Sequence, residues 1–93
     1  MFDIETERRN RIRVSVAAYA YEVRDHSIMS DAEFDALALK INPEISTGNT
    51  ELDLFFREKF NSYTGSWIFR HPDLHGIIDI YIRYYAKDAK YED

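Results

Sequence analysis

The sequence predicts an all-α fold, a small bundle of about four helices. Apolar residues recur at three- and four-residue spacing in four segments, the pattern of helices that bury one face. Helix-start signals mark three of these segments. The 93 residues include only three glycines and two prolines, which disfavours a turn-rich β architecture. A chain of this length is expected to form one domain over residues 1–93, and 45% hydrophobic residues suffice for one core.

The first helix is expected from about Asp3 to Arg24. An apolar stripe at helical spacing runs along it, formed by Ile4, Ile12, Val16, Tyr19 and Val23. Further apolar residues widen the stripe in the C-terminal half: Val14, Ala17, Ala18 and Tyr21. We therefore expect this half to be buried on more than one side. The polar segment Asp25–Ser27 ends the helix.

The second helix has the clearest boundaries. Ser30 and Glu33 have the spacing of a capping box, in which each side chain accepts a hydrogen bond from the backbone N–H of the other residue. A core-facing stripe follows at helical spacing and consists of Phe34, Leu37, Ala38 and Ile41. Asn42–Pro43 is expected to end the helix, because a residue before proline disfavours helical geometry.

The third helix is expected to begin at Thr50, where Thr50–Asp53 forms a second, weaker capping arrangement. Its core-facing residues are expected to be Leu52, Phe55, Phe56 and Phe60. Leu54 is expected to face solvent. A turn signal, Thr64–Ser66, follows, and the apolar segment Trp67–Phe69 after it is expected to plug the edge of the core.

The fourth helix is expected to start near Pro72, because proline suits the first helical position, where its missing N–H would be unpaired anyway. Its broad apolar face consists of Leu74, Ile77, Ile78, Tyr81, Tyr84 and Tyr85. The charged segment Lys87–Asp93 is expected to form a frayed tail.

Composition limits the classes of function. The chain has no cysteine, which excludes disulfides and thiolate metal sites. No apolar run approaches the length of a membrane span, and the charged N-terminus differs from a signal peptide. We therefore expect a cytoplasmic protein without membrane association. The net charge of −5 argues against non-specific nucleic-acid binding, which requires a basic surface.

Four arginines within six residues form the strongest charge feature: Arg8, Arg9, Arg11 and Arg13. They could contact nucleic-acid phosphates, which would give binding that falls steeply with salt. However, Glu5 and Glu7 lie four residues before Arg9 and Arg11, the favourable orientation for helical ion pairs. A solvated, ion-paired helix face is therefore the preferred interpretation.

The two histidines His71 and His75 have the spacing of zinc ligands on a helix. His71 is expected at the helix cap before Pro72, and no third ligand is evident, so we predict no metal site. The serines lack the strand–turn–helix setting and the paired histidine that nucleophilic catalysis requires. We therefore expect no catalytic residues and no enzyme activity.

The segment Tyr19–Leu37 has the sequence Y-A-Y-E-V-R-D-H-S-I-M-S-D-A-E-F-D-A-L. A tyrosine pair, followed at this spacing by an S-D-A-E-aromatic-D box, resembles the N-terminal Ia module of NAD-dependent bacterial DNA ligases. The resemblance covers a helical pair over residues 12–41, about a third of the chain. In the ligases, this module binds the nicotinamide mononucleotide half of NAD.

The resemblance implies a nucleotide-binding site formed by Tyr21, Asp31, Phe34 and Asp35. Phe34 stands where the family has tyrosine, which keeps a stacking face but loses a hydroxyl. Glu22 stands where the family has histidine, and a carboxylate repels a phosphate at short range. The implied ligand is nicotinamide mononucleotide or NAD. The alternative interpretation is equally coherent: Asp31 and Asp35 are ordinary residues of the helix, and Tyr21 and Phe34 belong to the core.

The chain lacks the rest of a ligase. A ligase requires a lysine in a K-x-D-G setting, and none of Lys40, Lys59, Lys87 and Lys90 has that context. The chain therefore resembles a detached copy of the module, similar to small ligase-related proteins of phages and prophages.

The chain has more aromatic residues than a four-helix core of this size needs. The surplus is Tyr63, Trp67, Phe69, Tyr84, Tyr85 and Tyr91. Tyrosine and tryptophan dominate the hot spots of protein interfaces. An interaction face is therefore expected at the C-terminal helix and the Trp67 segment, formed by Trp67, Phe69, Tyr81, Tyr84 and Tyr85. A homodimer is one use of such a face, and completion of the core and its rim is the alternative.

Three functional hypotheses follow. The first is a non-enzymatic protein-interaction module, a phage accessory protein whose acidic surface suits an inhibitor of a basic nucleic-acid-handling or defence protein. The second is a binder of nicotinamide mononucleotide or NAD through the ligase-like residues. The third is a nucleic-acid contact through the arginine cluster.

Overall fold

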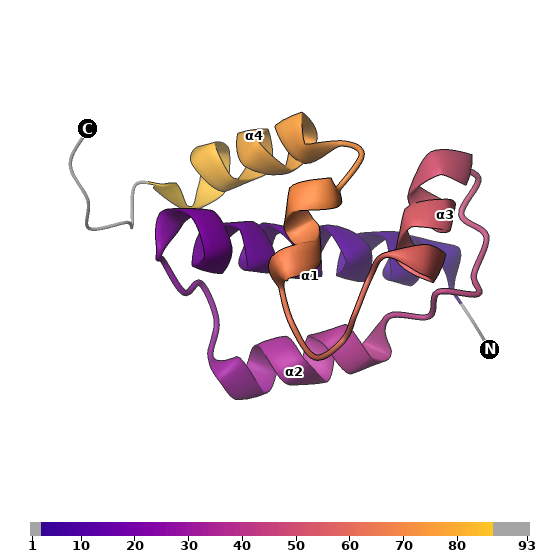
Figure 1. The fold of residues 1–93 in the computed structure, drawn as a ribbon, viewed down its shortest axis with the longest axis horizontal. Coiled ribbons are helices and arrows are strands. Elements are labelled where there is room, and N and C mark those ends of the chain that lie inside the picture. Colours follow the sequence, from indigo (N-terminus) through magenta and orange to yellow (C-terminus); the bar gives the residue numbers. More distant parts are fainter. Residues whose placement is uncertain (1–2, 87–93) are drawn as a thin grey trace.

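The computed structural model of the protein describes residues 3–86 and is all-α (Figure 1). The prediction of a small bundle of about four helices is confirmed. The elements in this part of the chain are α1 (Ile4–Arg24), α2 (Asp31–Lys40), α3 (Thr50–Glu58), the short 3₁₀ helix η1 (Ser66–Arg70) and α4 (Leu74–Tyr84). The expected charged tail, residues 87–93, and the aromatic Tyr91 lie outside the described residues.

Helix α1 is the central element of the fold. Helix α4 packs along one side of it, α2 lies along the other, and η1 crosses it (Figure 1). Because α1 is covered from several directions, every residue from Val14 to Ala20 is buried, as expected for its C-terminal half. The predicted stripe is wrong at four positions, since Ile4, Ile12 and Val23 are each 44% exposed and Tyr21 is 59% exposed.

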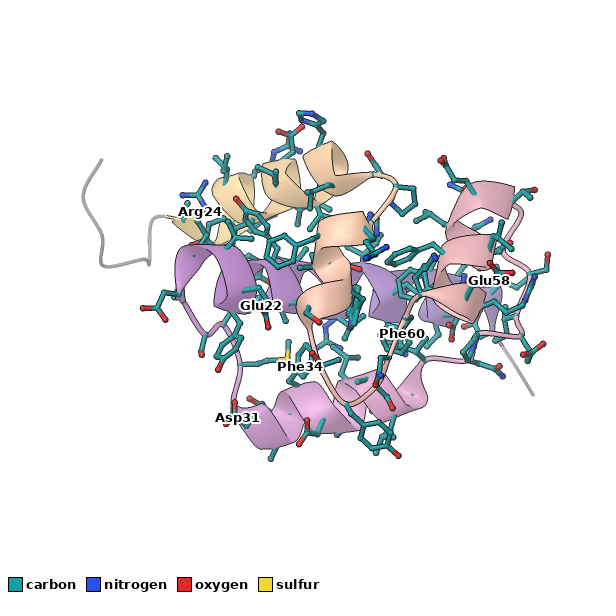
Figure 2. All side chains as sticks on the ribbon, in the orientation of Figure 1. Glu22, Arg24, Asp31, Phe34, Glu58 and Phe60 are labelled. Carbon is teal, nitrogen blue, oxygen red and sulfur yellow. The ribbon has the colours of Figure 1, made fainter. Side chains whose placement is uncertain are left out.

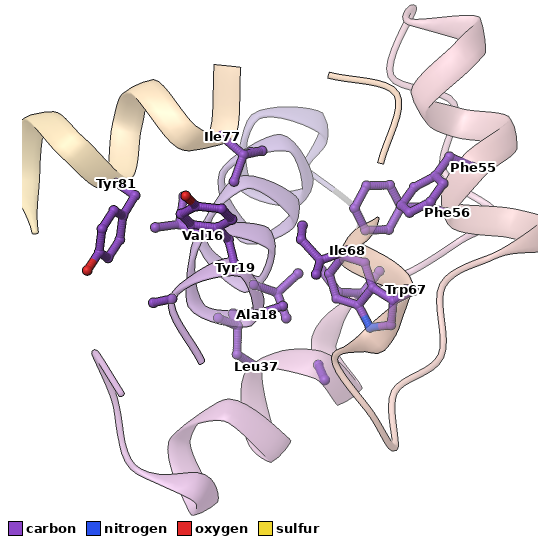
Figure 3. Close-up of a cluster of buried hydrophobic side chains, with 14 residues drawn as sticks. Val16, Ala18, Tyr19, Leu37, Phe55, Phe56, Trp67, Ile68, Ile77 and Tyr81 are labelled. Carbon is purple, nitrogen blue, oxygen red and sulfur yellow. The ribbon is translucent and has the colours of Figure 1, made fainter. Parts of the chain in front are cut away.

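The core joins two groups of aromatic rings around α1 (Figure 3). Tyr81 of α4 is fully buried, and its ring meets the ring of Tyr19 edge-on with centroids 5.4 Å apart. In the second group, Trp67 of η1 packs against Phe55 and Phe56 of α3, with ring centroids 6.0 Å apart in both pairs. The first group therefore joins α4 to α1, and the second joins η1 to α3.

The predicted capping box of α2 is confirmed. The backbone N–H of Ser30 donates to Glu33 Oε1 at 2.9 Å, and that of Glu33 donates to Ser30 Oγ at 3.1 Å. The hydrogen bonds from Ser30 lower the pKa of Glu33 below its usual value. Beyond the cap, Leu37 and Ala38 are buried in the core, and α2 ends just before the predicted break at Asn42–Pro43.

Helix α3 is attached to α1 by a buried ion-pair network. The Arg11 guanidinium donates to Glu7 Oε2 at 2.7 Å and to Asp53 Oδ1 at 2.8 Å. It also donates to the backbone carbonyls of Asn42 and Ile45, at 3.0 Å each. Glu7, Arg11 and Asp53 are at most 5% exposed. The network therefore links α1, the loop after α2 and α3 through side chains.

The predicted solvated arginine face is wrong for Arg11, which this network buries. The Glu7–Arg11 pair forms as predicted, but Glu5 pairs with Arg8 at 3.1 Å and not with Arg9. Arg8 also donates to the carbonyl oxygen of Thr47. Arg11 is buried because the loop after α2 returns to α1, where the Arg11 guanidinium donates to the carbonyls of Asn42 and Ile45.

Helix α3 begins at Thr50 as predicted, but its capping residue and the start of α4 differ from the prediction. Asn49, and not Thr50, caps α3 by accepting from the N–H of Leu52 at 3.1 Å. Asp73 caps α4 by accepting from the N–H of Gly76 at 3.2 Å, so Pro72 precedes the helix by two residues. In both cases, a short polar side chain next to the predicted start provides the better acceptor.

His71, expected as a helix cap, is instead buried at the end of η1. Its ring lies 5.2 Å from that of Phe55, and its Nδ1 accepts from the N–H of Asp73 at 3.0 Å. Burial lowers the pKa of His71 below its usual value of 6.5, and the negative charge of Asp73 offsets this only in part.

The lowered pKa of His71 predicts an acid-sensitive fold. As the pH falls below about 6.5, the unfolded chain binds the proton before the folded chain does, so the free energy of unfolding decreases until the folded pKa is passed. Replacing His71 with asparagine, which keeps an acceptor for Asp73, should reduce this slope in denaturant titrations across that range. His75→Asn on the exposed side of α4 is the matched control, and equal slopes for all three proteins would contradict the prediction.

In the described part of the chain, no helix combines the length and the apolar character needed to cross a membrane.

Candidate ligand pocket

A pocket lies between the C-terminal half of α1, the first turns of α2 and the loop that precedes η1. Its volume is about 290 Å³, near the lower end of small-molecule sites. Its walls include every residue that the ligase resemblance implicates: Tyr21, Glu22, Asp31, Phe34 and Asp35. The fold therefore brings together two groups of residues separated by eight positions in the sequence.

The end of α1 determines how the two helices meet. Asp25 adopts a left-handed conformation, with φ 52° and ψ 41°, and its N–H donates to the carbonyl of Ala20. Aspartate tolerates this conformation better than most side chains. The chain then reverses so that α2 runs back along α1 (Figure 1). Tyr21 and Glu22, in the last turn of α1, consequently lie opposite the first turns of α2.

The first turns of α2 supply the other wall. The Ser30 cap fixes the start of the helix, which places Asp31, Phe34 and Asp35 at i, i+3 and i+4 on one face. Phe34 is half-buried and packs against the core, whereas Asp31 and Asp35 are exposed. Figure 2 shows Glu22 and Phe34 directed into the space between α1 and α2, with Asp31 at the start of α2.

The third wall is the loop Tyr63–Gly65, which the sequence identified only as a turn. The indole N–H of Trp67 donates to the carbonyl of Thr64 at 2.6 Å and fixes the loop to η1. A Cβ built at Gly65 would lie 3.4 Å from Ala18 Cβ and 3.5 Å from Glu22 Oε2. The loop backbone thus approaches α1 closely, and Tyr63, 89% exposed, stands at the edge of the pocket.

The pocket is acidic. Glu22, Asp31 and Asp35 contribute carboxylates, and among the residues that the structure describes no lysine, arginine or histidine lines it. Within residues 3–86, the ion pairs are those of Arg8 and Arg11, so none of these three carboxylates has a cationic partner there. The carboxylates are therefore available to accept hydrogen bonds from a ligand.

The alternative that Tyr21 and Phe34 belong to the core fails for Tyr21, which is 59% exposed. Phe34 serves both roles, since it touches the core and lines the pocket. The sequence contained only a weak indication that the loop Tyr63–Gly65 forms the third wall of the pocket. Ala17 and Ala18 leave room on α1, and Gly65 has no side chain to fill it, but nothing in the sequence pairs these positions.

The predicted interaction face is corrected at two positions. Trp67 is 4% exposed and Tyr81 is fully buried, because Trp67 fills the space between α1 and α3 and the Tyr81 hydroxyl lies 2.9 Å from His26 Nδ1. Tyr85 is half-buried. Phe69 and Tyr84 remain on the surface, at 59% and 60% exposed.

The two histidines considered as zinc ligands are not equivalent, since His71 is buried and His75 is exposed. Among residues 3–86, no three histidine, cysteine, aspartate or glutamate side chains lie close enough together to hold a metal ion.

Comparison with protein-family models, with curated proteins and with solved structures finds no match to this chain.

Proposed function

We propose that the protein binds the nicotinamide-nucleoside part of a nicotinamide nucleotide in the pocket between α1, α2 and the Tyr63–Gly65 loop. The observation that carries the proposal is that one pocket is lined by all five positions of the ligase-like motif. The ligase resemblance implied these residues from the sequence, and the pocket is defined by the geometry of the fold. Their coincidence favours a ligand over the interpretation of these residues as ordinary helix surface.

Each lining residue has a role that suits this ligand. The Tyr21 and Phe34 rings offer apolar faces on which a nicotinamide ring stacks. Asp31 and Asp35 lie one turn apart and accept hydrogen bonds from ribose hydroxyls. Asp31 lies in the first turn of α2, next to the Ser30 cap that fixes the start of the helix. The function is binding and not catalysis, as the sequence predicts.

The proposal predicts saturable binding at a defined place. In an NMR titration with nicotinamide mononucleotide, NAD and nicotinamide riboside, at least one ligand should shift the amide signals of Tyr21, Gly65 and residues 31–35. The double variant Asp31→Asn/Asp35→Asn should weaken this binding at least tenfold, because two acceptors for the sugar hydroxyls are altered. Glu58→Gln, an exposed change on α3 far from the pocket, is the matched control (Figure 2). Unchanged spectra with all three ligands at millimolar concentration would overturn the proposal.

A second candidate is a protein-interaction module, the first hypothesis from the sequence. The observation that favours it is the exposure of Phe69 on η1 and of Ile82 and Tyr84 on α4, each more than half exposed. The two candidate functions are distinguished by which substitutions abolish function in the cell. Asp31→Asn with Asp35→Asn removes a ligand site, whereas Phe69→Ala with Tyr84→Ala removes a docking surface.

A further inference from the structure

We infer that the pocket selects an organic cation without a phosphate, a pyridinium nucleoside, over the phosphorylated form of the same molecule. The inference rests on the proposed function, because it specifies the class of ligand that the same pocket takes. It depends on the charges and rings that line the pocket.

The first observation is the negative charge of the pocket lining. Three carboxylates line the pocket, from Glu22 on α1 and from Asp31 and Asp35 on α2, and no basic side chain of residues 3–86 lines it. None of the three is paired with a cation within residues 3–86. A cationic ligand gains attraction from all three carboxylates, whereas a phosphate group is repelled by all three. The negative charge of the pocket therefore discriminates between ligands that have the same ring and sugar but differ in charge.

The second observation is the set of aromatic rings around these charges. Tyr21, Phe34 and Tyr63 come from three separate segments and all line the pocket. Tyr21 and Tyr63 are more than half exposed, so their rings are not covered by other side chains. The face of an aromatic ring attracts a cation and stacks on a flat heterocycle. A positively charged pyridinium ring uses both properties together.

The third observation is the position of Glu22. It is half-buried, and its Oε2 lies 3.5 Å from where a Cβ of Gly65 would stand, so the carboxylate lies between α1 and the loop. Asp31 and Asp35 are exposed at the rim. A carboxylate that is partly withdrawn from water acts on a ligand more strongly than one at the rim, because its field is less screened. Glu22 is therefore the main determinant of charge selection.

A metal ion fits this arrangement poorly. In the described part of the chain, no three acidic or histidine side chains approach closely enough to coordinate one ion. The three carboxylates are spread over two helices, around a cavity of about 290 Å³. A larger cation with delocalised charge and several hydroxyl groups matches this spread better than a point charge does.

The test compares three ligands by isothermal titration calorimetry. Nicotinamide riboside is cationic, its reduced dihydro form is neutral with the same sugar, and nicotinamide mononucleotide adds a phosphate. Nicotinamide riboside should bind at least tenfold more tightly than either of the other two. Its affinity should fall as the salt concentration rises, because the attraction is electrostatic.

Variants of Glu22 test the assigned determinant. Glu22→Gln should reduce the preference for nicotinamide riboside over nicotinamide mononucleotide at least fivefold, and Glu22→His should reverse the preference. Glu58→Gln, which removes a carboxylate of the same size from α3, should leave the preference unchanged. Circular dichroism of each variant establishes that the fold is intact, and the comparison of ligands on the unmodified protein needs no variant.

The outcomes separate the two proposals. If nicotinamide mononucleotide binds the unmodified protein as tightly as the riboside, the charge selection is wrong while the proposed function stands. If the neutral dihydro form binds as tightly as the cation, the charge selection is likewise wrong. If none of the three ligands binds, the proposed function itself is wrong, and the inference falls with it.

Discussion

Replacing Arg11 with methionine is expected to lower the free energy of unfolding by roughly 3–5 kcal/mol, the cost of breaking a buried ion pair from one side. Arg11 is 5% exposed, and its guanidinium joins Glu7 and Asp53. Methionine has a similar length but no charge, so both carboxylates would remain buried without a cation. The carbonyls of Asn42 and Ile45 would also lose the guanidinium as a donor. Chemical denaturation followed by circular dichroism measures the change.

Arg9→Met is the matched control, because Arg9 is two residues away on the exposed face of α1. A surface substitution of this kind usually changes the free energy of unfolding by less than about 0.5 kcal/mol. Equal stabilities for Arg11→Met and Arg9→Met would mean that the buried network does not hold α3 in place.

The second large effect is expected for Trp67→Ala, which should destabilise the fold by roughly 3–5 kcal/mol. Trp67 is 4% exposed and packs against the aromatic rings of α3 and the Phe60 ring, 4.9 Å between centroids. The substitution leaves a cavity where the indole was, and it removes the hydrogen bond to the carbonyl of Thr64. Because that bond positions the loop of the pocket, ligand affinity should fall as well.

Phe69→Ala provides the comparison for Trp67→Ala, since the two aromatic residues are neighbours in η1 with opposite environments. Phe69 is 59% exposed, so its removal should change the melting temperature little. A loss of stability in Phe69→Ala as large as that in Trp67→Ala would contradict the placement of these two rings.

The helices were predictable because their signals are local. The capping box of Ser30 and Glu33 lies within four residues, and the alternation of apolar residues on α2 requires no knowledge of its neighbours. The same holds for α3, where Phe55 and Phe56 are buried and Leu54 is exposed, as the spacing predicts. The start of α3 at Thr50 was predicted correctly, whereas α4 begins two residues after Pro72. In both helices a polar side chain next to the predicted position is the cap.

Arrangements that depend on distant segments could not be predicted. Arg11 and Asp53 are 42 residues apart, and the sequence shows one as part of a charged cluster and the other as a helix-start residue. Only the return of the chain after α2 puts them in contact. Likewise, the sequence predicted that the C-terminal half of α1 is buried on more than one side, but not that Tyr21 and Val23 in that half are exposed.

Two walls of the pocket were implied by the ligase resemblance, and the third was not. The residues that the resemblance implies lie on α1 and α2. These two helices are consecutive and joined by a short connection, so their pairing is a local feature of the sequence. The loop Tyr63–Gly65 reaches the pocket through the packing of η1 on α1, which is a long-range contact. The interaction face was overestimated for a similar reason, because burial of Trp67 and Tyr81 depends on which elements cover them.

The central claim is that a nicotinamide nucleoside occupies the pocket between α1, α2 and the Tyr63–Gly65 loop. An isotope-filtered NOE experiment on labelled protein with nicotinamide riboside tests it most directly, because it reports which protein protons lie near the ligand. The account predicts contacts from the pyridinium ring protons to the rings of Tyr21 and Phe34, and from the ribose protons to residues near Asp31 and Asp35. Contacts confined to other surfaces, such as that of Phe69 and Tyr84, would contradict it.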